Sequence, residues 1–302
     1  MVCFVILHYM ALEETVVCVE SILHNVEGEK RIVVVDNASP NGSMNELRDK
    51  YGGNPLVDVL ETGENLGFAR GNNLGLQQAL DKGYDATLLL NADAWLCEDD
   101  TLQRLAEAHR RYPDFGILSP VHLTGNADKP EHGFATYTHL TDLDRQPEAD
   151  IAEAPFIDAA VWFVPTTTWQ KVGLFAPLFY HYGEDLNFVH RLHYHGLRIG
   201  YLPRTYACHD REFRPVSRER FFHVESTYHL SEYAHIGRLL PSAFAFGALA
   251  PVKKALKALL TGHPSDARRY MNISLTLIGR TREVLRTRRE SRHVDLRNYL
   301  VV

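Results

Sequence analysis

The chain has 302 residues, of which 45% are hydrophobic and 23% are charged, and its formal net charge is -6 at pH 7. This composition excludes a largely disordered protein, and the negative balance excludes a general attraction to nucleic acid. Four cysteines without a Cys-x-x-Cys pair, and an N-terminus that opens directly into an apolar strand, favour a reduced cytoplasmic protein without a signal peptide.

Apolar strands and amphipathic helices alternate along the first 120 residues. The predicted strands lie at 2–7, 32–35, 56–60, 88–90 and 115–119, and the predicted helices lie near 12–23, 43–51, 75–80 and 98–111. Continuous apolar strands that alternate with helices are typical of a parallel sheet buried on both faces. The sequence therefore predicts an α/β fold in which helices cover both faces of a mostly parallel sheet.

The pattern is less regular in the second part of the chain. Residues 122–154 are polar, and we expect no clear elements there beyond a short hairpin over the site. A strand at 157–164, a short helix from 168, a helix up to 195 and a final strand at 197–202 follow. We predict a sheet domain at 1–215, with halves at about 1–120 and 121–215, and a helical extension at 216–302.

The helical extension combines an apolar run with a group of cations. The run at 239–252 is shorter than the roughly 20 apolar residues that span a bilayer, and Lys253, Lys254 and Lys257 follow it. One interpretation is an interfacial helix that contacts the inner face of the cell membrane. The other is packing against the core or a second subunit, with the cations in water, which leaves a homodimer open.

Several polar segments follow the predicted strands. Asp36 and Asp93 each follow a parallel strand, so they are expected to face one crevice at the carboxyl edge of the sheet. Between them, the segment from Asn65 to Gly75 is rich in glycine and asparagine, which we expect to let the backbone come close to a ligand, and it contains Arg70, which suits a phosphate. Its glycine spacing matches neither the dinucleotide fingerprint nor a P-loop. A diphosphate with a divalent cation on one or two carboxylates remains the best fit, although Asn91 and Asp93 also suit a simple turn.

A set of motifs in fixed order resembles a known family. The motifs are Val35-Asp36-Asn37-Ala38-Ser39, the segment from Asn65 to Gly75, Asn91-Ala92-Asp93, Gly173-Leu174-Phe175, Glu184-Asp185 with Arg191, and the segment from Gly196 to Tyr201 followed by His209. Together they resemble glycosyltransferase family 2, which has the GT-A fold, and especially its rhamnosyltransferase-like branch. The resemblance covers about residues 2 to 212.

The resemblance implies a role for each matching residue. Asp185 would be the general base, and Asp93 and His209 would hold a divalent metal, Mn²⁺ or Mg²⁺. Independently of the motif match, we expect Glu184 to orient the site or bind the acceptor, and Asp158 and Trp162 to contact the acceptor. The nucleotide would be bound by a larger set, namely His8, Tyr9, Asp36, Asn65, Arg70, Asn73 and Asn91. Asn91 stands where the family carries the first acid of an Asp-x-Asp motif, which weakens metal ligation at that position.

The implied enzyme is an inverting, non-processive glycosyltransferase of surface polysaccharide synthesis. It would move rhamnose or another hexose from a nucleotide-diphosphate donor to a saccharide or lipid-linked acceptor. A nucleotidyltransferase is one alternative, but it needs a Gly-rich basic loop after the first strand, where this chain has His8-Tyr9-Met10-Ala11. A catalytically inactive binding domain is the other alternative, and Asn91 favours it.

Overall fold

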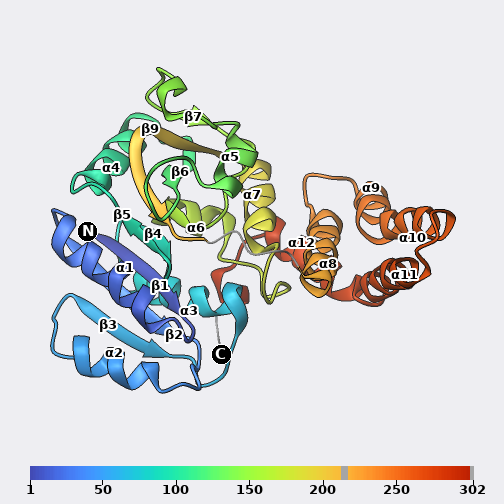
Figure 1. Cartoon of the computed structure of the whole chain (residues 1–302), viewed down its shortest axis with the longest axis horizontal. Coiled ribbons are helices and arrows are strands. Elements are labelled where there is room, and N and C mark those ends of the chain that lie inside the picture. Colours follow the sequence, from blue (N-terminus) through green and yellow to red (C-terminus); the bar gives the residue numbers. More distant parts are fainter. Residues whose placement is uncertain (212–216, 300–302) are drawn as a thin grey trace.

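A computed structural model describes residues 1–211 and 217–299 and consists of two parts (Figure 1). The sheet body comprises residues 1–209, and the helical unit comprises residues 218–292 at the other end of the long axis. After the helical unit, the last described residues return to the sheet body near α3 (Gly67–Asp81). Among the described residues, no helix is long and apolar enough to cross a membrane.

The sheet body is built on a mixed sheet of nine strands in the order β3-β2-β1-β4-β8-β6-β9-β5, with β7 paired to β9. Six strands run in one direction, and β5, β7 and β8 run against them. The strands are β1 (Val2–His8), β2 (Lys30–Asp36), β3 (Val57–Glu61), β4 (Ala86–Asn91), β5 (Ala94–Leu96), β6 (Phe115–Leu123), β7 (Ala152–Glu153), β8 (Val161–Pro165) and β9 (Arg198–His209).

Helices cover both faces of this sheet because its strands carry apolar side chains on both sides. In β1, Cys3 and Val5 pack toward α3, α6 and α7, whereas Phe4 and Ile6 pack toward α1, α2 and α4. The helices of the sheet body are α1 (Leu12–Asn25), α2 (Ser43–Tyr51), α3, α4 (Thr101–Arg111), α5 (His132–Thr138), α6 (Thr166–Val172) and α7 (Glu184–Tyr194). The predicted α/β architecture with helices on both faces is confirmed.

Two glycines of the Asn65 to Gly75 segment serve this packing and not a ligand. A Cβ at Gly75 would lie 2.6 Å from Cγ1 of Val5, and one at Gly71 would lie 2.6 Å from Cδ1 of Leu7. The missing side chains therefore let α3 approach β1 closely. Our expectation that these glycines bring backbone close to a ligand was wrong for Gly71 and Gly75.

Three local features differ from the sequence expectations. The last strand continues beyond residue 202 to His209, and the unpredicted strand β5 pairs with its end, so that Ala94 lies opposite His209. The region 122–154 holds the short helix α5. Strand β8 runs antiparallel to β4, a direction that an apolar pattern does not encode.

The helical unit packs beside α7. It consists of α8 (Arg218–Ala234), α9 (Leu240–Phe244), the π-helical turn η2 (Ala245–Leu249), α10 (Ala250–Leu260), α11 (Pro264–Gly279) and α12 (Thr281–Arg292). Arg288 of α12 donates hydrogen bonds to the backbone carbonyls of Tyr233, His235 and Arg238, which ties α12 to the end of α8. Tyr299 then enters the core of the sheet body, where it is 2% exposed.

Candidate active site

Asp93 and His209 meet at the carboxyl edge of the sheet. Asp93 follows β4, His209 ends β9, and the pairing of β5 with β9 brings the two segments together, with a hydrogen bond of 2.8 Å from the Asp210 amide to the Asp93 carbonyl. His209 Nε2 lies 3.5 Å from Asp93 Oδ1 and 3.4 Å from the Asn91 side-chain amide nitrogen. Two side chains predicted to hold a metal therefore adjoin each other, although they are 116 positions apart in the chain.

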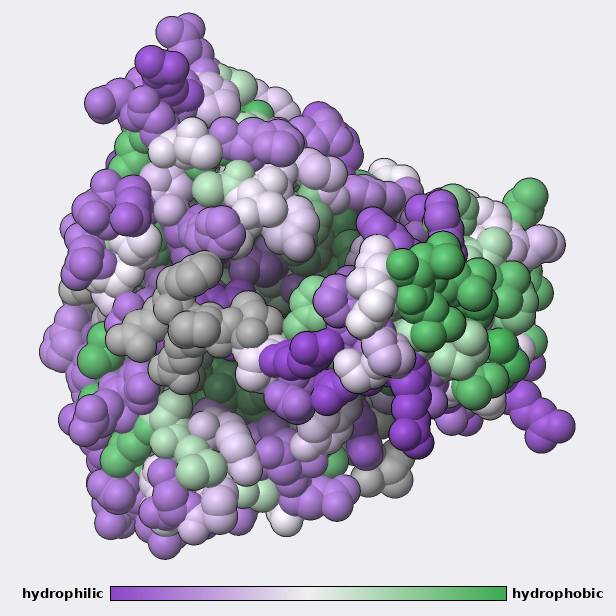
Figure 2. All heavy atoms as spheres, turned by 45° about the vertical axis from the view of Figure 1, so that its right-hand side comes forward, coloured by the Kyte–Doolittle hydropathy of each residue, from purple (hydrophilic) through white to green (hydrophobic). Residues whose placement is uncertain are grey.

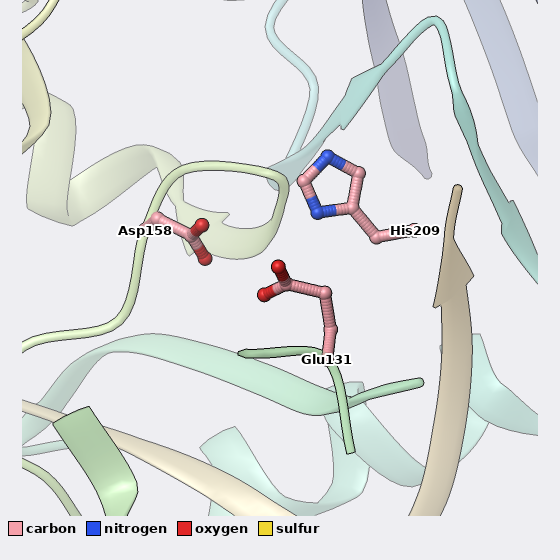
Figure 3. A group of neighbouring side chains, drawn as sticks. All are labelled: Glu131, Asp158 and His209. Atoms are coloured by element: carbon pink, nitrogen blue, oxygen red, sulfur yellow. The ribbon is translucent and has the colours of Figure 1, made fainter. Parts of the chain in front are cut away.

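Two further carboxylates lie on the other side of the same imidazole. One ligand atom each from Glu131, Asp158 and His209 lies within 4.8 Å of the others, and Figure 3 shows one ring nitrogen turned toward both carboxyl groups. This nitrogen is Nδ1, because Nε2 faces Asn91 and Asp93. Both His209 Nδ1 and Asp158 Oδ1 are buried without a hydrogen-bond partner in the described part of the chain. Buried polar atoms that lack partners suit a bound cation or a bridging water.

Local structure holds these two acids in place. Glu131 caps the N-terminus of α5, where its Oε2 accepts a hydrogen bond of 2.9 Å from the Phe134 amide. Asp158 Oδ1 lies 3.3 Å from Nδ1 of the fully buried His122, whose Nε2 lies 2.9 Å from the Ser119 hydroxyl. Burial opposes ionisation of Asp158, but the neighbouring His122 and His209 lower its pKa nonetheless.

Glu184 and Asp185 begin helix α7 and have unequal acidities. Burial, followed by the charge of Asp185, raises the pKa of Glu184 to about 8. Burial also raises the pKa of Asp185 to about 6, and the Asp158 carboxylate adds to this effect. Glu184 is therefore the weaker acid of the pair, and Asp185 ionises first as the pH rises. A carboxylate whose pKa lies just below neutral pH is suited to accept a proton.

Tyr137 of α5 is the aromatic residue whose hydroxyl is affected by Asp185 and Asp158. Burial raises its pKa, and the charges of Asp185 and Asp158 raise it further, so its hydroxyl lies within the field of both carboxylates. Its ring packs edge-on against Phe156 at a centroid separation of 4.6 Å, and the side chain remains 43% exposed. Tyr137 therefore offers an accessible aromatic surface beside Asp185.

Fewer of the residues predicted to bind the nucleotide are exposed than we expected from the sequence. Tyr9 and Asn65 are exposed, Arg70 and Asn91 are half-buried, and Asp36 is buried. The Asn65 side-chain oxygen accepts hydrogen bonds of 3.0 Å from the Gly67 amide and from the Tyr180 hydroxyl, so it shapes the turn before α3.

Three predicted site residues lie in the protein interior and are corrected here. His8 is fully buried, and its ring nitrogens lie 2.7 Å from the hydroxyls of Thr15 and Ser43. Asn73 is also fully buried, and its amide bonds to the backbone of Phe175 and Tyr299. Trp162 is 0% exposed, with its ring stacked on Phe175, so it cannot contact an acceptor. The packing of β1, α3 and β8 turns these side chains into the core, a direction that motif matching does not reveal.

The structure also brings residues to the site that the sequence did not indicate. Glu131, His122 and Tyr137 all come from the segment in which we expected little regular structure. An acid one position before a short helix is a signal for a cap, but capping acids are common at protein surfaces. Only the packing of α5 against the sheet turns Glu131 toward His209.

Comparisons with known proteins identify relatives of this chain in sequence and in fold. The hexosyltransferase Agl10 of low-salt glycan biosynthesis in Haloferax volcanii is 23% identical over 231 residues, which cover 74% of this chain and 70% of that protein. The crystal structure of S. aureus TarS 1-349 with UDP-GlcNAc matches with a TM-score of 0.59 and 16% identity, over 99% of this chain and 89% of that one.

A second solved structure extends the comparison. GalNAc-T7 with UDP, GalNAc and Mn²⁺ matches with a TM-score of 0.60 and 15% identity over 76% of this chain, which spans only about half (48%) of that protein. These likenesses show the GT-A fold. Residues 3–150 also match the sequence model described as Glycosyl transferase family 2. Residues 3–150, which hold the first strands of the sheet body, therefore carry the sequence pattern of glycosyl transferase family 2.

Proposed function

We propose that this glycosyltransferase is an inverting, non-processive hexosyltransferase that uses a nucleotide-diphosphate sugar. The observation that supports the proposal is the position of Asp158, which lies beside His209 of the Asp93–His209 pair and whose charge also acts on Asp185. An accessible base and a metal-binding pair together meet the needs of transfer from a diphosphate leaving group.

The metal would be held by Asp93 and by Nε2 of His209. A bound divalent cation would neutralise the developing charge on the diphosphate, as a Lewis acid does. Glu131 and Asp158 would fix the imidazole through Nδ1, because a ligating histidine is generally oriented by a carboxylate on its other nitrogen. A donor set of carboxylate and imidazole suits Mn²⁺ better than Mg²⁺, which prefers oxygen ligands.

Asp185 would act as the general base. Its carboxylate accepts the proton of an acceptor hydroxyl while that oxygen forms a bond to the anomeric carbon and the bond to the diphosphate oxygen breaks. One displacement on one face inverts the anomeric configuration, whereas retention by the usual route needs a second, nucleophilic carboxylate. Glu184, the weaker acid of the pair, would orient α7 or the acceptor beside Tyr137.

The relatives suggest which donors and acceptors are the first candidates. S. aureus TarS binds UDP-GlcNAc and GalNAc-T7 binds UDP, so UDP-hexoses are the first candidates, with nucleotide-linked rhamnose as a further candidate. Tyr9, Asn65, Arg70 and Asn91 would contact the nucleotide. Asp36 would join them despite its burial, because its Oδ1 has no hydrogen-bond partner among the described residues. The Haloferax volcanii relative takes part in glycan biosynthesis, which supports a saccharide or lipid-linked acceptor of surface polysaccharide synthesis on the cytoplasmic side of the membrane.

A donor panel tests the proposal. The protein is incubated with UDP-, GDP- and dTDP-linked hexoses, with and without Mn²⁺ or Mg²⁺, and the released nucleoside diphosphate is measured. We expect metal-dependent release from one donor class and a product with inverted anomeric configuration by NMR. A retained configuration contradicts the single displacement. Release of pyrophosphate from a nucleoside triphosphate and a sugar phosphate indicates a nucleotidyltransferase, and donor binding without turnover indicates an inactive domain.

A further inference from the structure

The far end of the helical unit has small residues inside and large apolar residues outside. Its buried positions include Ala248, Ala255, Ala258 and Ala267. Its exposed apolar side chains include Phe246, Leu249, Leu256, Leu259, Leu260 and Leu275, with Leu260 90% exposed and Leu256 56% exposed. A helix that meets only water places its leucines inward and its polar residues outward, so this arrangement is the reverse of the usual one.

Close packing of small residues explains how α10 packs on α11 without burying its own leucines, whereas the inner part of the unit buries large side chains such as Leu230 and Leu277. The helices α10 and α11 meet through Ala255, Ala258 and Ala267, with the Tyr270 ring beside them. In η2, a Cβ at Gly247 would lie 2.3 Å from Cβ of Tyr233 on α8, so only glycine permits that approach. The helices are thus held together by backbone proximity, and their large apolar side chains remain available to a partner.

The two opposite faces of helix α10 carry side chains of different size. Pro251, Ala255 and Ala258 follow one another at helical spacing and are buried. On the other side of the helix, Leu256 and Leu260 are exposed, and Lys253 and Lys257 flank them on the same exposed arc. Figure 2 shows apolar side chains gathered on the end of the helical unit farthest from the sheet body. An exposed apolar patch of this kind marks a docking surface.

The charge of the helical unit narrows the chemistry of the partner. Residues 218–292 contain 14 Lys and Arg but only 6 Asp and Glu, a net charge of +8, so the remaining residues carry -14. Many cations of the unit are paired, for example Lys254 with Glu225. Within the described ranges, however, neither Lys253 nor Lys257 has a carboxylate within the 4.0 Å of an ion pair. The partner should therefore be both apolar and anionic.

We propose that the outer face of η2 and α10 docks on an anionic lipid bilayer, with the leucines at the depth of the acyl chains and the lysines at the headgroups. An 11-residue helix is about 16 Å long, which suits a helix that lies in the interface and does not span it. Lysine stems extend along apolar surface while their ammonium groups reach phosphate, so Lys253 and Lys257 match a lipid surface. A symmetric dimer through the same face would instead bring two units of charge +8 together.

This docking goes beyond the proposed function and does not depend on it. Co-sedimentation with vesicles measures it directly, because the readout is bound protein and not turnover. We expect the intact chain to bind vesicles of phosphatidylcholine with phosphatidylglycerol, and to bind pure phosphatidylcholine vesicles more weakly. Added salt should weaken binding, because screening reduces the attraction between lysines and headgroups.

Paired variants test which residues carry the docking. The double variant Leu256→Ser with Leu260→Ser should lower the vesicle partition coefficient about tenfold or more, and Lys253→Glu with Lys257→Glu should remove the preference for anionic lipid. Val17→Ser is the matched control, because Val17 is 51% exposed on α1 of the sheet body. Circular dichroism should show that all variants remain folded, since the replaced side chains point outward.

Two results would overturn the proposal. One is the absence of intact protein from sedimented anionic vesicles at low salt. The other is a homodimer, measured by light scattering, that dissociates in the Leu256→Ser with Leu260→Ser variant while vesicle binding is unaffected, because that result assigns the face to a second copy. Absent glycosyl transfer with intact vesicle binding would contradict the proposed function and leave the docking supported.

Discussion

The sheet body and the helical unit use the same apolar residue types in opposite ways. In the sheet body, leucines such as Leu88 are fully buried between the sheet and its helices. At the outer end of the helical unit, Leu256 and Leu260 lie outside and alanines fill the contact between α10 and α11. A part that buries its large side chains is complete by itself, whereas a part that exposes them is shaped for another surface.

The two parts also differ in what their charges do. The sheet body concentrates carboxylates at one edge, where burial and mutual repulsion make Glu184 and Asp185 weaker acids than usual. The helical unit displays cations, and two lysines adjoin its apolar face. The comparison indicates that chemistry and docking reside in different parts, so substitutions should separate them.

The largest expected effect is on turnover. Asp185→Asn should lower the rate of transfer by about a hundredfold or more, because the variant cannot accept the acceptor proton. Donor affinity and vesicle binding should not change, since Asp185 is proposed to contact the acceptor and lies outside the docking face of η2 and α10. Steady-state kinetics measure the effect, and Asp144→Asn, an exposed acid near η1 (Leu143–Arg145), is the control. Near-normal turnover in Asp185→Asn would remove this residue from the role of base.

The pH dependence of the wild-type enzyme also tests whether Asp185 is the general base. Asp185 acts only when it is ionised, and burial raises its pKa to about 6. As pH falls through that value the ionised fraction falls, so kcat/KM should drop about tenfold for each pH unit below about 6 and level off above it. Vesicle binding should not follow this profile. A profile that remains flat down to pH 5 contradicts the assignment.

The next effect concerns the metal. Asp93→Asn should abolish Mn²⁺ binding measured by calorimetry, because it removes the one carboxylate that faces His209 Nε2 among the described residues. Glu131→Gln should weaken binding only about 10- to 100-fold, since it disturbs the orientation of the imidazole. Asp99→Asn, an exposed acid in the loop between β5 and α4, is the control. If Glu131→Gln abolishes binding and Asp93→Asn does not, the ion lies on the Nδ1 side of His209.

The smallest expected effects are on the free energy of unfolding, which we compare for one leucine in each part. Leu88→Ala leaves a cavity in a packed core and should lower the free energy of unfolding by about 2–5 kcal/mol. Leu260→Ala removes a side chain that is 90% exposed and should change it by less than about 0.5 kcal/mol. Urea unfolding measures both. Equal losses would mean that Leu260 is covered in solution, as in a dimer.

Much of the sheet body followed from the sequence because its signals are local. Continuous apolar strands and helical periodicity placed the first four strands, and they indicated helices on both faces. The match to Asn91-Ala92-Asp93 and to His209 named two residues that the structure brings within 3.5 Å. Local patterns carry this information because each strand and helix must bury its own apolar face.

The tertiary structure alone decided which of these residues can meet a ligand. We expected His8, Asn73 and Trp162 to contact a ligand, yet each is buried, because the side to which a strand or helix residue points depends on how its element packs in the sheet body. Strand β5 is only three residues long and exists because β9 continues far enough to pair with it.

The sequence by itself determined the α/β class, the motif order and the cationic character of the helical unit. Only the tertiary structure placed Glu131 beside His209, across 78 positions of chain, and turned the leucines of α10 outward. The physical reason is the same in both cases. The side to which a helix turns depends on its neighbours, and here α5 packs on the sheet while α10 packs on α11 through alanines.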